Sequence, residues 1–209
     1  MAKVNGGLES RISGMVGPVV FVNFNGGTYV RQAQRPRGKN NWSPLQKDVR
    51  KRFSGFCVFW RQSVPESVKQ IWESASEKMN GFNLFLKFNL QAFGYDGKLA
   101  DPERLHLSQG VLSLPHKIKA TLVEEEAKEV VISWASDSMS GMDSLNDELM
   151  IMAAGENIFT GPISTGAIRK QGAATIQLPE IPEVITGIYL FFQSVERNLY
   201  SPDLYFQII

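Results

Sequence analysis

Residues 43–93 read SPLQKDVRKRFSGFCVFWRQSVPESVKQIWESASEKMNGFNLFLKFNLQAF, and this stretch decides how the chain folds around it. It begins with Ser43 as a helix N-cap and Pro44 at the first helical position, which together are a common helix start. Apolar residues then recur every three or four positions, as on one buried face of a helix: Leu45, Val49, Phe53, Phe56, Cys57 and Trp60. The pattern predicts a core helix that contains a buried structural cysteine.

Two further helical segments are predicted after this first helix. The second starts near Ser63 and Pro65, continues through Trp72 and ends at Asn80-Gly81. The third spans residues 82–93, where phenylalanine and leucine recur at helical spacing. Residues 43–93 are therefore expected to form a helical hairpin or unit, and residues 94–110, rich in Gly, Asp and Pro, a linker after it.

From residue 111 onward the pattern changes to short β-prone runs separated by turn residues. The predicted strands are VLSL, IKATLV, EVVISW, ELMIMAA, NIFT, AATIQL, GIYLFFQS and LYFQII. Their spacing predicts an antiparallel β-sandwich over residues 111–209. With Trp134 in an early strand and Tyr189 in a late one, this part resembles a fibronectin type III or immunoglobulin-like domain, a fold that implies no activity by itself.

Residues 1–42 are expected to form a Gly-rich arm, a β-hairpin and a basic linker, which makes the predicted fold class α+β. The hairpin strands are residues 19–24 and 28–32, and Asn25-Gly26 between them favours a tight turn. The first eighteen residues are expected to be an extended arm. A two-stranded ribbon is marginal alone, so the hairpin must pack on its own chain or on a neighbour.

Charge is distributed unevenly along the chain. Residues 1–70 carry twelve Lys/Arg and three Asp/Glu, whereas residues 71–209 carry ten and eighteen. The basic segment 31–52 supplies the candidate binding residues, namely Arg31, Arg35, Arg37, Lys39, Lys47, Arg50 and Lys51. These side chains form a solvated surface, contact nucleic-acid phosphates without reading sequence, or meet the acidic half of another copy.

No pattern in the sequence points to catalysis. The chain has two histidines and one cysteine, and it lacks the serine-hydrolase, zinc-protease, phosphate-loop and dinucleotide-binding motifs. Asp137, Asp143, Asp147 and Glu148 lie close together in sequence without the spacing of a calcium loop. We therefore expect no catalytic residue, no cofactor and no metal site.

Neither a secretory signal nor a membrane-spanning run is apparent in the sequence. The N-terminal residues MAKVNGGLES have no hydrophobic block after the lysine, and no apolar run reaches the length of ~20 residues that a membrane helix needs. We therefore expect no membrane insertion, and a chain that is cytoplasmic as synthesised or is part of a virion or other particle.

The motifs KVNGGL, SGMVGPVV, FNGGTYVR and SPLQKDVRKRF together resemble an uncharacterised family of Bacteroidota proteins. Its members begin with a Gly-rich hairpin, continue with a Ser/Thr-Pro-x-Gln helix and end in a β-domain. Met15 departs from the pattern, because the family usually carries a lysine there. The resemblance implies a bacterial or phage origin and a two-part fold, and it names no catalytic residue.

These features together favour a non-catalytic structural or assembly protein that is a subunit of a virion, filament or other particle. We expect a homo-oligomer formed through the N-terminal arm and the halves of opposite charge. The alternative is a sequence-nonspecific nucleic-acid-binding protein that uses the basic segment 31–52.

Overall fold

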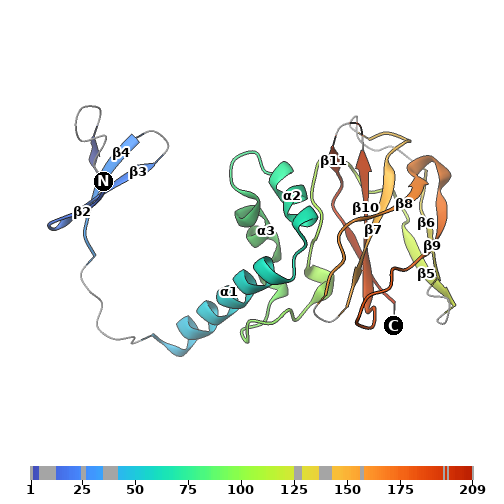
Figure 1. Cartoon of the computed structure of the whole chain (residues 1–209), viewed down its shortest axis with the longest axis horizontal. Helices are drawn as coiled ribbons and strands as arrows, with labels where there is room; N and C mark the ends of the chain where they lie inside the picture. The colour runs from blue at the N-terminus through green and yellow to red at the C-terminus, as the bar shows by residue number, and fades with distance from the viewer. Residues whose placement is uncertain are drawn as a thin grey trace. The chain divides into compact units, whose positions relative to one another are not determined.

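The chain consists of two compact units, Met1–Ser43 and Pro44–Ile209. The computed structural model, drawn in Figure 1, describes residues 2–4, 13–24, 27–34, 42–124, 129–136, 143–155, 158–194, 196 and 198–208. Except for Ser43, the first unit coincides with the residues predicted as arm, hairpin and linker. The second unit contains the predicted helical unit, the predicted linker and the predicted β-region within one compact body.

The first unit is a four-stranded antiparallel sheet with the strand order β1-β4-β3-β2. The strands are β1 (Ala2–Val4), β2 (Gly14–Val16), β3 (Val19–Phe24) and β4 (Gly27–Gln32). The predicted hairpin is confirmed, since β3 pairs with β4, although the turn at residues 25–26 lies outside the described residues. The described residues of the predicted free arm instead form β1 and β2, which pair with the two edges that the hairpin offers.

Three α-helices begin the second unit: α1 (Pro44–Gln62), α2 (Glu66–Ser74) and α3 (Gly81–Asn89). The 3-10 turns η2 (Leu90–Ala92) and η3 (Pro102–Arg104) follow. Asn80 caps α3, because its side chain accepts a hydrogen bond from the backbone N–H of Asn83 at 2.8 Å. The Asn80-Gly81 pair thus begins the third helix, whereas the second helix has already ended at Ser74.

The rest of the second unit is antiparallel sheet. A five-stranded sheet contains β7 (Glu148–Ala154), β8 (Ile163–Ile168), β10 (Gly187–Ser194), β11 (Leu199–Tyr200) and β12 (Leu204–Gln207). A three-stranded sheet contains β5 (Lys119–Glu124), β6 (Glu129–Ser133) and β9 (Ala173–Gln177), and the turn η4 (Arg169–Gln171) leads from β8 into β9.

Most strand predictions are confirmed, and two are wrong. The run VLSL is not a strand, and NIFT contributes a single bridge between Phe159 and Ala154. Strand β8 was not predicted, because its sequence ISTGAI is small and polar in the middle and Gly166 has a φ of 70°. The mixed helix and sheet agree with the predicted α+β class.

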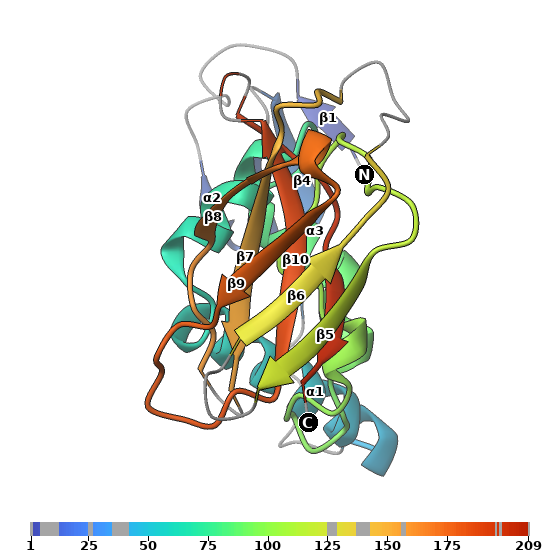
Figure 2. The same cartoon turned by 90° about the vertical axis from the view of Figure 1, so that its right-hand side faces the viewer.

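Both faces of the five-stranded sheet are buried, as the alternation of side chains along β7 and β10 shows. Met152, Tyr189 and Phe191 pack with the helices, while Ile151 and Leu190 pack with the three-stranded sheet. The strands of the two sheets are visible in Figure 2. The five-stranded sheet is therefore the middle layer, which joins the helical layer to the smaller sheet.

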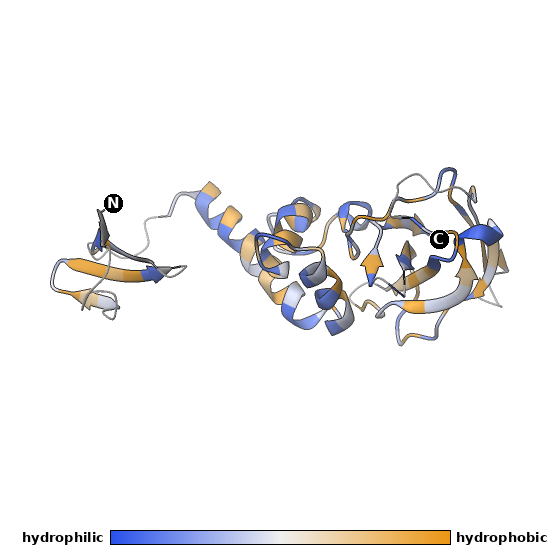
Figure 3. Cartoon of the chain, turned by 90° about the horizontal axis from the view of Figure 1, so that it is seen from above, coloured by the Kyte–Doolittle hydropathy of each residue, from blue (hydrophilic) through white to orange (hydrophobic). Residues whose placement is uncertain are grey.

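The first half of α1 departs from the predicted core helix. Phe56 is fully buried and Trp60 packs against the helical core, but Leu45, Val49 and Phe53 are 65%, 51% and 43% exposed. The single cysteine, Cys57, is only partly buried. This half of α1 extends beyond α2 and α3 (Figure 1), and it carries apolar segments along its length (Figure 3). The prediction of one continuous buried stripe, including Cys57, is therefore wrong.

The turn at residues 94–98 holds the middle of α1 in place. A Cβ atom added to Gly55 would overlap the carbonyl oxygen of Gly97, so the backbones touch where neither residue has a side chain. Next to this contact, Arg52 Nε donates to the Leu90 carbonyl at 2.9 Å, and its guanidinium lies 5.5 Å from the centre of the Tyr95 ring. The position of α1 thus depends on a glycine–glycine contact.

We predict that Gly55→Ala destabilises the second unit. Alanine is the better helix former by about 1 kcal/mol, so intrinsic propensity alone would stabilise α1. The overlap with Gly97 forces the turn away, and we expect a net loss of about 1–3 kcal/mol in urea unfolding. Ser54→Ala, at the exposed neighbouring position, is the matched control. A Gly55→Ala protein as stable as this control would contradict the close contact.

Candidate functional site

The seven predicted basic residues are divided between the two units, as far as the structure describes them. Arg31 is exposed on β4 in the first unit, while Lys47, Arg50 and Lys51 are exposed on α1 in the second. The remaining three, Arg35, Arg37 and Lys39, lie outside the described residues. The three cations on α1 are three and four positions apart, which places them along one side of the helix.

A groove of about 920 Å³ lies beside these cations, and we call it the α1 groove. It is formed by the exposed part of α1, by η2 and by the turn after η2. Its lining residues are Val49, Arg50, Lys51, Arg52, Phe53, Ser54, Cys57, Leu90 and Tyr95. The groove was not predicted from the sequence, because the apolar residues on its α1 wall have the spacing of core residues. The signal that could have revealed it is the run KDVRKRF, in which four cations accompany only two apolar residues.

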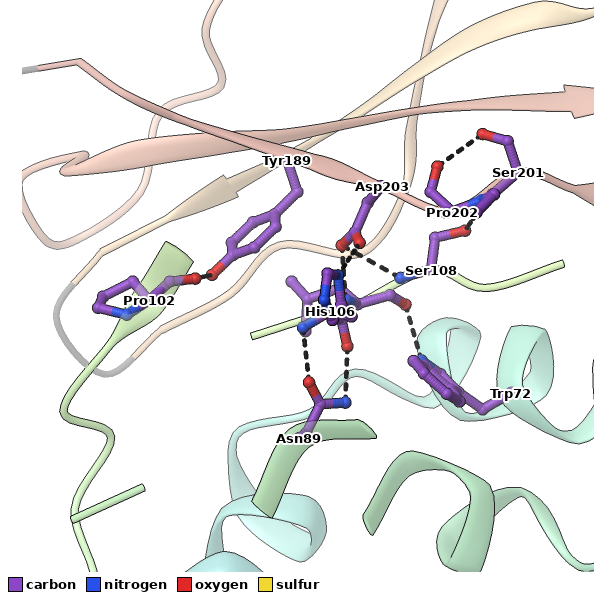
Figure 4. A network of polar contacts seen from close by, with 10 residues as sticks. Trp72, Asn89, Pro102, His106, Ser108, Tyr189, Ser201, Pro202 and Asp203 are labelled. Carbon is purple, nitrogen blue, oxygen red and sulfur yellow. Dashed lines mark hydrogen bonds and ion pairs between the residues drawn. The ribbon is translucent and has the colours of Figure 1, made fainter. Parts of the chain in front are cut away.

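A second cluster of polar residues centres on the buried carboxylate of Asp203 (Figure 4). Its Oδ2 accepts hydrogen bonds from the backbone N–H groups of Leu107, at 2.6 Å, and Ser108, at 3.3 Å. Its Oδ1 lies 2.9 Å from Nδ1 of His106. One side chain just before β12 therefore binds three consecutive residues of the segment that follows η3.

Side chains from the helices and the middle sheet bind the same segment. The Asn89 amide donates to the His106 carbonyl at 2.9 Å and accepts from the His106 N–H at 2.6 Å. Trp72 Nε1 donates to the Leu107 carbonyl at 3.0 Å, and the Tyr189 hydroxyl donates to the Pro102 carbonyl at 2.8 Å. Residues 102–108 form no regular strand, so these side chains satisfy backbone groups that would otherwise be buried without partners.

The His106–Asp203 pair has the form of a base and its orienting carboxylate. The hydrogen bond with Asp203 raises the pKa of His106, and partial burial of the ring opposes this effect. However, the Ser108 hydroxyl donates to the Ser201 carbonyl at 2.7 Å. Within the described residues, no nucleophile is hydrogen-bonded to His106, and the hydrogen bond with Asp203 fixes the position of the imidazole ring.

Two of the four clustered acidic residues, Asp143 and Asp147, lie beside a buried arginine. Arg169 is fully buried, with its Nε 3.6 Å from Asp147 Oδ2 and a terminal nitrogen 4.0 Å from Asp143 Oδ1. The guanidinium also donates to the Ser113 carbonyl at 2.8 Å and lies 4.6 Å from the centre of the Phe192 ring. These two carboxylates therefore form an ion-pair cluster inside the protein.

The other two of these four acidic residues take no part in the arginine cluster. Glu148 accepts a hydrogen bond from the backbone N–H of Gly166 at 3.1 Å, and Asp137 lies outside the described residues. In the part of the chain that the structure describes, no three His, Cys, Asp or Glu residues are grouped to hold a metal ion. Within that same part, no helix has the length and apolar character needed to cross a membrane.

Comparison with known proteins places the chain in a family. A family model described as "Family of unknown function (DUF6266)" matches residues 11–198, and thus reaches into both units. A search of curated proteins found no match. The description of this family names no activity. The surfaces described above are the features of the chain that bear on its function.

We predict that the His106–Asp203 pair makes stability depend on pH. Because the pKa of His106 is raised above its ordinary value of 6.5, folding favours the protonated ring. The contribution of the His106–Asp203 pair to the free energy of unfolding is fully present below pH 6.5, the ordinary pKa of histidine. It is lost as the pH rises through the higher pKa that His106 has in the folded state. The free energy of unfolding, measured with urea from about pH 5.5 to about pH 8.5, should contain this decline.

The decline should disappear in His106→Gln and persist in His116→Gln, which controls for the loss of a histidine elsewhere. An identical pH profile for His106→Gln and the unmodified protein would show that the pair does not contribute.

Proposed function

Because the chain belongs to the DUF6266 family of unknown function, we propose its role from its own surfaces: it is a non-catalytic assembly subunit that associates with further copies of itself. The observation that carries this proposal is that the described residues of the first unit form a single sheet. An isolated sheet is stable when it buries at least one face against another layer. A second copy of the chain is the partner that we propose for this face.

The described residues of the first unit form one sheet with apolar side chains on both faces. Met15 and Val20 lie opposite one another on one face, and Phe21 and Val30 on the other. Among the residues of this unit whose exposure the structure describes, 13–23, 28–34, 42 and 43, Thr28 alone is buried, while Met15 is 72% exposed. A sheet with two partly apolar faces and so little core of its own is suited to pack against a partner.

Charge favours another copy of the chain as that partner. Residues 1–43 carry six Lys/Arg and one Asp/Glu, whereas residues 44–209 carry sixteen and twenty. The first unit of one copy and the second unit of another therefore attract each other. Contacts of this head-to-tail kind use different surfaces on the two copies and extend into rings or filaments.

The proposal extends to the architecture and the setting of the protein. The two sheets of the second unit share a hydrophobic core, which supports a β-sandwich of the fibronectin type III kind, a frequent adhesive module. We propose that such subunits build a virion, filament or other particle of bacterial or phage origin. The extent of association and the particle morphology, seen by light scattering and electron microscopy, test this part.

We predict that Met15→Glu weakens self-association. The residue is 72% exposed, so the change leaves the sheet folded, but it places a negative charge where an acidic neighbour would bind. The mean mass from light scattering at matched concentrations should fall towards the monomer. Val123→Glu, at a position 53% exposed on β5, is the control and should keep the mass of the unmodified protein. Equal masses for all three proteins would argue against a role for this face.

A second candidate function is nucleic-acid binding through the basic residues. The specific observation in its favour is the row of Lys47, Arg50 and Lys51 on the exposed part of α1. Side chains that contact phosphates give affinity without sequence preference and make binding depend strongly on salt. The alternative therefore requires duplex DNA of any sequence to bind with similar affinity.

We predict, for this alternative, that replacing Lys47 and Lys51 with alanine lowers the salt dependence of DNA binding. Removing one lysine–phosphate interaction reduces the slope of log K against log salt by about 0.9. Fluorescence anisotropy with a labelled random duplex at several salt concentrations measures the slope. Lys119→Ala, on β5, is the control. If the unmodified protein does not bind the duplex at low salt, the alternative is excluded.

A further inference from the structure

We propose that the α1 groove binds the loop between β9 and β10, residues 178–186, of a second copy of the chain. This inference rests on the proposed self-association, and it adds a second contact between copies to the one made by the first unit. It follows from three properties of the described residues: an uncovered apolar groove with a basic rim, an uncovered apolar loop with acidic residues, and the position of the two on different parts of the fold.

The groove offers apolar surface that the described residues of the second unit leave exposed. Val49 is 51% exposed and Phe53 is 43% exposed, and both lie on the groove wall with Leu90 and Tyr95. The exposed Lys51 and the partly buried Arg52 border this surface. Arg52 is held by the Leu90 carbonyl and the Tyr95 ring, so part of the positive charge is fixed before a partner arrives.

The loop offers the opposite charge together with a prominent apolar side chain. It reads LPEIPEVIT, and Val184 is 79% exposed, the largest value among the exposed large hydrophobic residues of the described chain. Glu180 is also exposed, and Ile181 is partly exposed beside it. The loop contains Pro179 and Pro182, whose fixed φ angles lower the conformational entropy that binding would cost.

Charge decides between the possible occupants of the groove. A second α1 would bring its own cations against Lys51 and Arg52, and the first unit, with six Lys/Arg against one Asp/Glu, would do the same. The loop instead brings Glu180 to the basic rim and Val184 to the apolar wall. An apolar centre surrounded by complementary charges is the usual anatomy of a protein interface.

The two surfaces lie on different layers of the second unit. The groove belongs to the helical layer, whereas the loop leaves the three-stranded sheet at β9 and enters the middle sheet at β10. In Figure 2 the connection from β9 to β10 extends beyond the strands. Because one copy offers both surfaces, each bound copy leaves a groove or a loop for the next, which gives a ring or a filament.

The single cysteine provides a direct test, since Cys57 lines the groove and is partly exposed. The unmodified chain, with its one thiol at Cys57, is mixed with a tagged Cys57→Ser/Val184→Cys variant, whose one thiol is on the loop. A short bismaleimide crosslinker then joins thiols that lie close together. We expect a covalent pair of one tagged and one untagged chain on a denaturing gel. A tagged Cys57→Ser/Val123→Cys variant, with its thiol at the exposed β5 position, should crosslink at least tenfold less.

Charge reversal adds a second test to the same crosslinking assay. Lys51→Glu in the untagged chain should lower the yield of the mixed pair, and Glu180→Lys in the tagged loop variant should restore it. Both positions are exposed, so neither change disturbs the fold. A yield that Glu180→Lys fails to restore would overturn the proposed pairing.

The outcomes separate this inference from the proposed function. If light scattering shows association but the two cysteine variants crosslink equally, the groove is occupied by something other than the loop and this inference fails alone. If the protein stays monomeric at every concentration, both proposals fail. Preferential crosslinking at Val184→Cys, together with the charge rescue, supports both.

Discussion

The second unit depends on one buried carboxylate. Asp203 lies just before the last strand, and it binds backbone N–H groups of Leu107 and Ser108, about a hundred positions earlier in the chain. The segment it holds runs between the helical layer and the middle sheet, where Asn89 and Trp72 bind the segment from the helical side. A buried charge is costly unless it is fully hydrogen-bonded, so this position tolerates few alternatives. The helices are thereby fixed to the sheet by polar contacts in addition to apolar packing.

The packing of the helices and the smaller sheet on the middle sheet determines which surfaces stay exposed and can bind a partner. The middle sheet has one face against the helices and the other against the three-stranded sheet, so its side chains are committed to the core. The carboxylates of Asp143 and Asp147 face Arg169, and His106 is bound to Asp203. Among the described residues, the titratable groups that suggest chemistry are thus engaged in holding the fold, and the uncovered surfaces lie at its margins.

The first unit differs from the second in how little of it is buried. Its described residues form one sheet, with apolar residues such as Met15 and Val16 exposed on β2. Hydrogen bonds between strands satisfy the backbone, but they do not remove apolar surface from water. A partner that covers the sheet would supply the missing burial. The unit's excess of cations favours an acidic partner, and we propose the larger unit of another copy as that partner.

The sequence by itself determined the local elements, because helical and strand periods are properties of neighbouring residues. The start of α1, the β3–β4 hairpin and strands such as β6 and β10 were predictable in this way. The tertiary structure alone decided which apolar residues are covered. Phe53 and Phe56 belong to the same helical pattern, yet Phe56 is buried and Phe53 lines a groove, because α1 extends beyond the elements that pack on it. It also decided that Asp203 meets Leu107, since two positions 96 residues apart share no local signal. Which side chains are buried, and which distant residues pair, depends on where segments far apart in the sequence lie in space. The spacing of residues along the chain does not specify those positions.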